Sequence, residues 1–299
     1  MKRRGLSAVS GDIFLRWLLR GCALALCLGV GGLLVFLLFK GLPELGMRLF
    51  FGDVPALDAL LGRQAVWDGL WPACAGTACL VGLTVSLAVF PGVGCGLYLV
   101  EFASARRAAR IRLAMDVLAG TPSIVMGLFG FTLILFLRRT FWPDANTSLL
   151  LAAACLALLV LPVLVTATCE ALEAVPPSLR TTASVLGFTR RQAARHILLP
   201  AAAPGIRGGV ILALGRAAED TAVIMLTGVV ANAGLPAGLG AKFEALSFSI
   251  FYTAAQYQSR EELLRGFGAA LVLLLLASGL LVCARLLEAR FRRRWQGEA

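Results

Sequence analysis

Long apolar segments alternate with shorter polar segments along this chain. Runs of about 20 residues without a charge recur, and a helix of that length crosses the ~30 Å hydrocarbon core of a bilayer. The pattern predicts six membrane-spanning helices, at about 21–39, 69–100, 117–137, 145–169, 208–230 and 266–284. The second has no charge over 32 residues, so it should be tilted, kinked near Pro91 or preceded by an interfacial piece.

Arginines in the connecting segments indicate the orientation. They concentrate in alternate polar segments, at 1–20, 101–116, 170–207 and the C-terminus. Because basic residues gather in loops that stay in the cytoplasm, this alternation places both termini inside. The other segments, 40–68, 138–144 and 231–265, are then external. The predicted fold class is an all-α polytopic membrane protein, with a short basic loop at 101–116 and short helices in the first external segment.

Composition agrees with a membrane protein and argues against a soluble or nucleic-acid-binding protein. Hydrophobic residues make up 59% of the chain, against about 45–50% in soluble domains. A net charge of +11 would suggest nucleic acid for a soluble protein, but cytoplasmic loops account for it here. The expected partner is therefore the lipid bilayer and not nucleic acid.

Residues suited to catalysis or metal binding are scarce. The eight cysteines lie in or beside apolar runs without CxxC spacing, so they are expected to be small core residues. His196 is the only histidine, which makes a histidine metal site or triad implausible. None of the three lysines (Lys2, Lys40 and Lys242) follows a glycine, so a GxxxxGK[ST] phosphate loop is absent. We expect no catalytic residue, metal or bound cofactor, and any ATPase must be another polypeptide.

A polar, basic segment at about 175–204 precedes the fifth apolar run. Pro176 and Pro177 can start a helix and Gly187 can break it, which predicts two short helices joined by a bend. Pro200 then marks the entry to the fifth membrane helix. The segment is either an amphipathic element lying on anionic lipid or a contact for a protein outside the bilayer.

Five residues of this segment have the spacing of a known motif: Ala183, Gly187, Ile197, Leu199 and Pro200. They resemble the EAA loop of bacterial ABC importer permeases, in which glycine follows the second alanine by four residues and nine residues lead to I-x-L-P. Threonines stand at the acidic and first alanine positions. In that family the loop forms the coupling helix, which docks into a cytoplasmic ATPase. The resemblance implies ATPase coupling by Thr181, Thr182, Ala183, Gly187, Ile197, Leu199 and Pro200.

Three ionisable residues interrupt the fifth apolar run: Arg216, Glu219 and Asp220. Each charge at the membrane centre costs about 2.5–3.5 kcal/mol on insertion scales. On a continuous helix both carboxylates are three or four positions from Arg216, so both should reach its guanidinium. The group is either a self-satisfied cluster at a helix contact or an anion site, because the planar fork of arginine suits phosphate-like groups.

The third apolar run contains the sequence GTPSIVMGLFG at 120–130. Its glycines and Pro122 weaken a helix and permit another backbone to approach closely. Thr121 and Ser123 offer hydroxyl groups. A packing face and a direct substrate contact both remain open.

Three motifs, taken in chain order, resemble those of the PstA/PstC family of phosphate ABC transporter permeases. YLVE at 98–101 is similar to Y-L-x-E, and 120–130 is similar to G-x-P-S-I-V-x-G-L-F-G. GRAAEDTA at 215–222 is similar to G-R-A-x-G-E-T-A. Arg216 and Asp220 therefore take the family's arginine and glutamate positions.

Glu219 departs from this pattern, because it stands where the family has glycine. It could cancel the charge of Arg216, be protonated on burial, or face another subunit. The resemblance implies a substrate pathway that includes Arg216, Asp220, Glu219, Thr221, Thr121 and Ser123.

The resemblance covers about 70–288 and favours PstA over PstC. It implies a type I ABC importer permease for inorganic phosphate, with a MetI-like fold in helices 2–6, in a bacterial inner membrane. Implied partners are a PstC-like permease, two PstB-like ATPases that use ATP and magnesium, and a periplasmic PstS-like phosphate-binding protein. The unit is flanked by a first part, 1–69, and a basic cytoplasmic tail, 289–299.

Two alternatives remain open. The same architecture could serve molybdate, sulfate or phosphonate. A stand-alone secondary transporter or channel would belong to another class. A membrane enzyme is least expected, because the sequence shows no nucleophile–base set or metal cluster.

Overall fold

The computed structural model describes residues 4–296, and within them it is helical, with one isolated β-bridge between Val229 and Phe243. Six helical segments of this range are long and apolar enough to span a membrane. They belong to α1 (Arg4–Gly41), α4 (Trp71–Glu101), α6 (Ser123–Thr140), α7 (Leu149–Glu173), α10 (Leu199–Glu219) and α13 (Arg260–Gln296). The predicted class, an all-α polytopic membrane protein, is confirmed.

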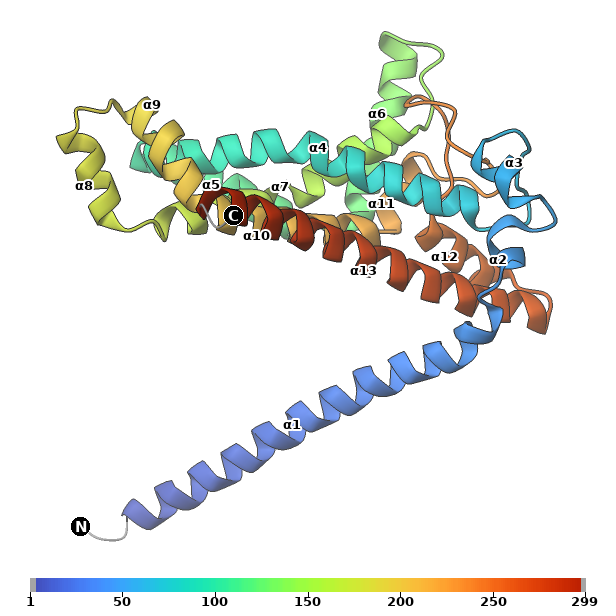
Figure 1. Cartoon of the computed structure of the whole chain (residues 1–299), viewed down its shortest axis with the longest axis horizontal. Helices are drawn as coiled ribbons and strands as arrows, with labels where there is room; N and C mark the ends of the chain where they lie inside the picture. Colours follow the sequence, from blue (N-terminus) through green and yellow to red (C-terminus); the bar gives the residue numbers. More distant parts are fainter. Residues whose placement is uncertain (1–3, 297–299) are drawn as a thin grey trace.

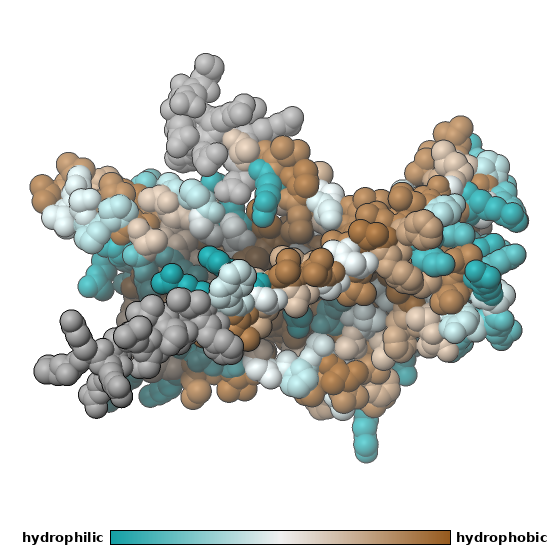
Figure 2. All heavy atoms as spheres, turned by 90° about the horizontal axis from the view of Figure 1, so that it is seen from below, coloured by the Kyte–Doolittle hydropathy of each residue, from teal (hydrophilic) through white to brown (hydrophobic). Residues whose placement is uncertain are grey.

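Shorter helices lie at both ends of the molecule (Figure 1). One end carries α8 (Pro177–Val185) and α9 (Arg190–Ala193), together with the C-terminal end of α13. The opposite end carries α2 (Met47–Phe51), α3 (Ala56–Leu60) and α12 (Leu246–Gln256). The arginine-rich segments thus share one end, as the charge alternation predicted. Apolar side chains dominate the middle of the face in Figure 2, and hydrophilic ones gather mostly toward the ends.

The first helix stands apart from the rest of the bundle (Figure 1). Its apolar side chains are exposed along its length, from Leu15 to Phe39. The C-terminal end of α1 contacts α13, where the Phe36 and Phe267 rings pack edge to face with their centroids 5.5 Å apart.

Small residues bring α4, α7 and α10 close together. A Cβ on Gly92 or Gly96 of α4 would lie 2.7 Å from Leu164 or 2.6 Å from Thr168 of α7. Gly209 of α10 approaches the Ala167 side chain of α7 in the same way. Membrane helices associate through such small faces because lipid supplies no hydrophobic drive between them.

The second spanning helix is continuous through Pro91. With 31 residues it is about 46 Å long at ~1.5 Å per residue, so it must tilt or project beyond the hydrocarbon core. Near its external end it supports the segment between α11 and α12, because the Leu246 N–H donates to Thr77 Oγ1 at 2.9 Å. Burial raises the pKa of Glu244 in that segment, although backbone N–H groups of Gly234 and Ala233 oppose the shift.

The expected basic loop at 101–116 is instead mostly a helix, α5 (Ala105–Ala119). Its partly buried residues Ala108, Ile111, Met115 and Leu118 recur at helical spacing and pack against neighbouring clusters. The prediction was wrong because the arginines between these positions hid the apolar stripe. The third predicted helix is consequently divided, since α5 ends before Gly120 and α6 begins at Ser123 after Pro122.

The glycines of α6 admit a close neighbour, as the sequence predicted. That neighbour is α11 (Ala222–Thr227). A Cβ on Gly127 would lie 2.9 Å from the Ala222 carbonyl oxygen, and one on Gly130 would lie 2.6 Å from Thr227 Cγ2. Since these contacts run in the same order along both helices, α6 and α11 lie parallel, with the first turn of α11 beside the second turn of α6.

Gly127→Val is expected to destabilise the protein by roughly 1–3 kcal/mol, because the added atoms meet backbone that cannot turn aside. Gly94→Val is the matched control, since a Cβ at Gly94 has no neighbour within 4 Å inside the described chain. Thermal unfolding in detergent measures both variants. Equal losses of stability would contradict the close approach of α6 and α11.

Candidate functional site

The element that projects at the arginine-rich end has the predicted bend. Pro177 opens α8, and Gly187 follows it with φ of +77°, a conformation that glycine adopts without strain. Thr189 and Gln192 then form a capping box that starts α9. Val185 and Leu186 are strongly exposed at the bend, with 81% and 66% of their surfaces accessible.

The seven residues of the EAA-like motif fall into two groups. Thr181 and Thr182 are exposed on α8, and their hydroxyls donate to the Pro177 and Ser178 carbonyl oxygens of the same helix. Ala183 is buried and Gly187 is exposed. The other three, Ile197, Leu199 and Pro200, are half-buried where the chain enters the bundle. Thr181, Thr182 and Gly187 are therefore available to a partner, whereas Ala183 is not.

The motif pattern missed one buried residue. Leu198, between the two motif positions, packs in a cluster with Leu172, Val175 and Ala202. Its apolar character was visible, but nothing in the motif distinguished it from its neighbours. It is the residue that anchors this turn to α7.

Pro200 lies at the entry to the fifth membrane helix, as expected, but the chain is already helical before it. The helix continues from Arg190 to Glu219, with a π-helical segment, Ala194–Leu198, joining α9 to α10. Pro200 falls in the first turn of α10, where its missing N–H is tolerated. A π-helical turn before a spanning helix is frequent at functional sites.

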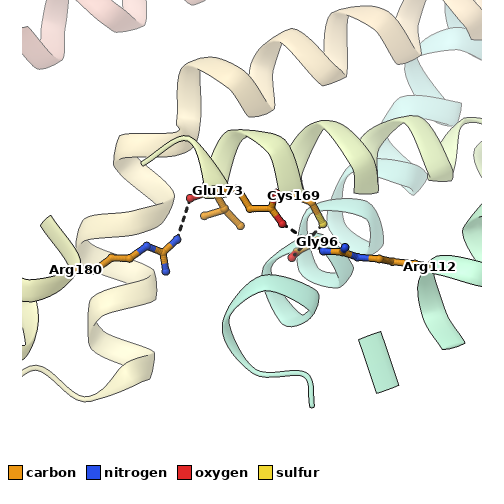
Figure 3. A network of polar contacts seen from close by, with 6 residues as sticks. Gly96, Arg112, Cys169, Glu173 and Arg180 are labelled. Atoms are coloured by element: carbon orange, nitrogen blue, oxygen red, sulfur yellow. Dashed lines mark hydrogen bonds and ion pairs between the residues drawn. The ribbon is translucent and has the colours of Figure 1, made fainter. Parts of the chain in front are cut away.

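A network of polar contacts lies beneath α8, at the ends of α4 and α7 (Figure 3). The Arg180 guanidinium of α8 donates to the Glu101 carboxylate of α4 and, at 2.9 Å, to the Leu172 carbonyl oxygen of α7. On α5, Arg112 donates to the Glu173 carboxylate at 3.2 Å. Glu101 belongs to the YLVE motif at 98–101, whereas no motif includes Arg112, Glu173 or Arg180.

The fifth predicted helix is broken where the sequence analysis expected an ion cluster. It ends at Glu219, and Asp220 has an extended backbone with ψ of 121°. Buried Asp220 accepts a hydrogen bond from the Val223 N–H at 2.9 Å, which caps the first turn of α11. The expectation of one continuous helix from 208 to 230 is therefore wrong.

The predicted pairing of Arg216 with both acids is also wrong. Within residues 4–296, neither Glu219 nor Asp220 forms an ion pair with Arg216, because the cap holds Asp220 and the helix ends before it. Arg216 and Glu219 are exposed on the surface of the chain. A capping signal was present in the sequence, since an aspartate preceding an apolar run is a strong helix start.

The remaining pathway candidates lie at the two helix breaks. Thr121 donates to the Val117 carbonyl oxygen at 2.8 Å, and half-buried Ser123 begins α6. Half-buried Thr221 precedes α11. Because α11 begins beside Gly127, in the second turn of α6, Thr221 lies further along the bundle than Thr121 and Ser123.

Asp220→Ala is expected to destabilise the protein by about 1 kcal/mol through loss of the cap, whereas Asp220→Asn keeps an acceptor oxygen and should retain stability. Thermal unfolding and uptake assays on both variants test this. Loss of uptake in a stable Asp220→Asn protein would show that the charge, and not the cap, is required.

Residues 4–296 contain six spanning segments, a bent element projecting from the arginine-rich end and a spanning helix interrupted at Asp220, which define a polytopic membrane protein. Residues 92–296 match the family described as "Binding-protein-dependent transport system inner membrane component", and the chain belongs to this family.

Curated relatives agree with the motif resemblance. Phosphate transport system permease protein PstA 1 of Mycobacterium tuberculosis (strain CDC 1551 / Oshkosh) is 33% identical over 227 residues, which cover 76% of this chain and 72% of that protein. PstA of Haemophilus influenzae is 32% identical over 273 residues, covering 90% and 87%. PstC 1 of Mycobacterium bovis is 28% identical over 223 residues, covering 67% and 65%.

Solved structures agree on the fold. A chain of the MetNI methionine ABC transporter in inward-facing conformations aligns with a TM-score of 0.55, covering 81% of this chain and 99% of that chain at 18% identity. A chain of a bacterial alginate ABC transporter, in complex with an alginate pentasaccharide-bound periplasmic protein, aligns with a TM-score of 0.58. It covers 94% of this chain and 97% of that chain at 15% identity. The predicted MetI-like permease fold is confirmed, and the chain is a transporter subunit and not an enzyme.

Proposed function

We propose that this chain is the PstA-like permease of an importer for inorganic phosphate. Relatives named for phosphate transport support the substrate. The structural observation that carries the proposal is Arg216, an exposed guanidinium on a spanning helix without an ion pair inside the described chain. A charge in the membrane is costly unless it is paired or lines a pathway, and arginine binds phosphate through two hydrogen bonds.

The proposed complex contains other subunits. A PstC-like permease would complete the pathway beside Arg216, and a periplasmic PstS-like protein would deliver phosphate. Two PstB-like ATPases would bind ATP and magnesium, so this chain needs no cofactor of its own. The proposed location is a bacterial inner membrane, with α8 and α9 in the cytoplasm, where arginine-rich segments are retained.

The proposed mechanism starts at the bend. Exposed Val185 and Leu186 offer the ATPase an apolar contact next to Gly187, and Thr181 and Thr182 lie on the same short helix. Movement of α8 would alter the packing of the spanning helices and open the pathway to one side at a time. Arg216 would compensate the anion's charge in transit, with Thr121, Ser123, Thr221, Asp220 and Glu219 near the helix breaks.

Reconstitution tests the proposal. The chain is combined with the three partner types in proteoliposomes, and uptake of labelled phosphate is measured with and without ATP. Phosphate uptake that depends on ATP and on the binding protein is the expected result. Preferential uptake of molybdate, sulfate or phosphonate would replace the substrate, and uptake by this chain alone would indicate a secondary transporter or channel.

A further inference from the structure

Both α4 and α7 end on a glutamate, Glu101 and Glu173. A carboxylate at a helix C-terminus is unfavourable, because it adds to the negative end of the helix dipole and to the unsatisfied carbonyls there. Each glutamate is met by an arginine from a different element. Arg180 of α8 reaches Glu101, and Arg112 of α5 reaches Glu173 (Figure 3 shows the two arginines near the end of α7).

The two ion pairs differ in their surroundings. The side chains of Arg180 and Glu101 are 34% and 14% exposed, whereas those of Arg112 and Glu173 are 57% and 56% exposed. Solvent screens an exposed ion pair, and such pairs contribute little to the stability of the folded protein. The sheltered pair is the stronger link, and it joins residues 79 positions apart in the sequence.

Arg180 also makes a second contact that Arg112 lacks in the described structure. One guanidinium nitrogen donates to Glu101, and another donates to the Leu172 carbonyl oxygen in the last turn of α7. A single planar group therefore holds the ends of two spanning helices, a geometry that lysine cannot reproduce. Among the nine residues of α8, only Ala183 is buried, so few other side chains attach this helix to the bundle.

We propose that Arg180 is a positioning residue that transmits movement of α8 to α4 and α7. The covalent chain already connects α8 to α7 and, through α9, to α10. Contact with α4 has no such connection and depends on the Arg180–Glu101 pair. A force on α8 thus reaches three spanning helices together. This inference rests on the proposed function, since it takes a partner ATPase as the source of that force.

The test uses the complete complex in proteoliposomes, carrying Arg180→Gln, Glu101→Gln or both. Phosphate moved per ATP hydrolysed should fall at least fivefold in each single variant, while assembly and ATP hydrolysis stay within about twofold of the unmodified complex. Because the residues act as one pair, the double variant should lose little more than either single variant. Arg112→Gln is the matched control and should keep the ratio within twofold.

An unchanged ratio in Arg180→Gln and Glu101→Gln would overturn the proposal, as would losses that multiply in the double variant. If Arg180→Gln fails to assemble, Arg180→Lys and Glu101→Gln are tested in its place. A ratio of phosphate to ATP equal to that of the unmodified complex in both variants would overturn the proposal. Hydrogen exchange of the α8 amides reports on the Arg180–Glu101 link without any transported substrate. Exchange should be faster in Arg180→Gln and Glu101→Gln than in Arg112→Gln. An unmodified complex that moves no phosphate would refute the proposed function, while the exchange comparison still decides on the link.

Discussion

Arg216→Ala is expected to lower phosphate uptake roughly 10- to 100-fold while the complex still assembles. Hydrogen bonds to a charged group contribute about 1.5–3 kcal/mol, and each 1.4 kcal/mol corresponds to a factor of ten. Arg216 is exposed and makes no ion pair within residues 4–296, so its removal leaves no partner charge stranded inside this chain. Its loss should therefore act on the anion and not on folding.

Two further variants make this result specific. Arg216→Lys keeps the charge but loses the planar fork, so uptake should lie between that of the alanine variant and that of the unmodified protein. Leu212→Ala is the matched control, because Leu212 is also exposed and lies one helical turn earlier on α10. Normal uptake in Arg216→Ala, or an equal loss in Leu212→Ala, would remove the proposed anion role.

Gly187→Val is expected to uncouple ATP hydrolysis from transport. With φ of +77°, Gly187 has a left-handed backbone that costs other residues about 1–2 kcal/mol, and β-branched residues are the least tolerant. A Cβ at this position meets no atom of the described chain within 4 Å, so the effect must come from the backbone and not from a clash. The bend should open and the exposed contact at Val185 and Leu186 should shift.

Asparagine at the same position is the control, because it tolerates the left-handed conformation. Gly187→Asn should keep transport per ATP close to normal, whereas Gly187→Val should lower it several-fold with the ATPase still bound. Copurification measures binding, and paired assays of uptake and hydrolysis measure coupling. Equal behaviour of the two variants would show that the bend is not required.

Local signals predicted much of the bent element formed by α8 and α9. Prolines, a glycine and an amphipathic pattern gave two short helices and a bend, and Gly187 has the left-handed conformation. They did not identify Arg180, because the segment carries several arginines and only one lies beside Glu101. The role of the motif residues stays a prediction, to be tested by the coupling assays.

The membrane charges show where sequence reasoning went wrong. The continuous apolar run predicts a continuous helix, which would put Asp220 one turn from Arg216. The chain instead breaks there, because Asp220 caps α11 and α11 packs against the glycines of α6. The sequence carries both signals, an aspartate suited to a helix start and an apolar run long enough for one helix, and in the structure the cap prevails.

Local sequence was enough to predict the number of spans, the gathering of the arginine-rich segments at one end and the bend at Gly187. These follow from hydropathy, charge and backbone conformation, which are properties of short segments and of the surrounding bilayer. Contacts between distant segments establish that α6 lies beside α11 and that Arg180 joins α4 to α7. Those pairings depend on which helix ends meet in space, and residues far apart in sequence carry no local signal of one another.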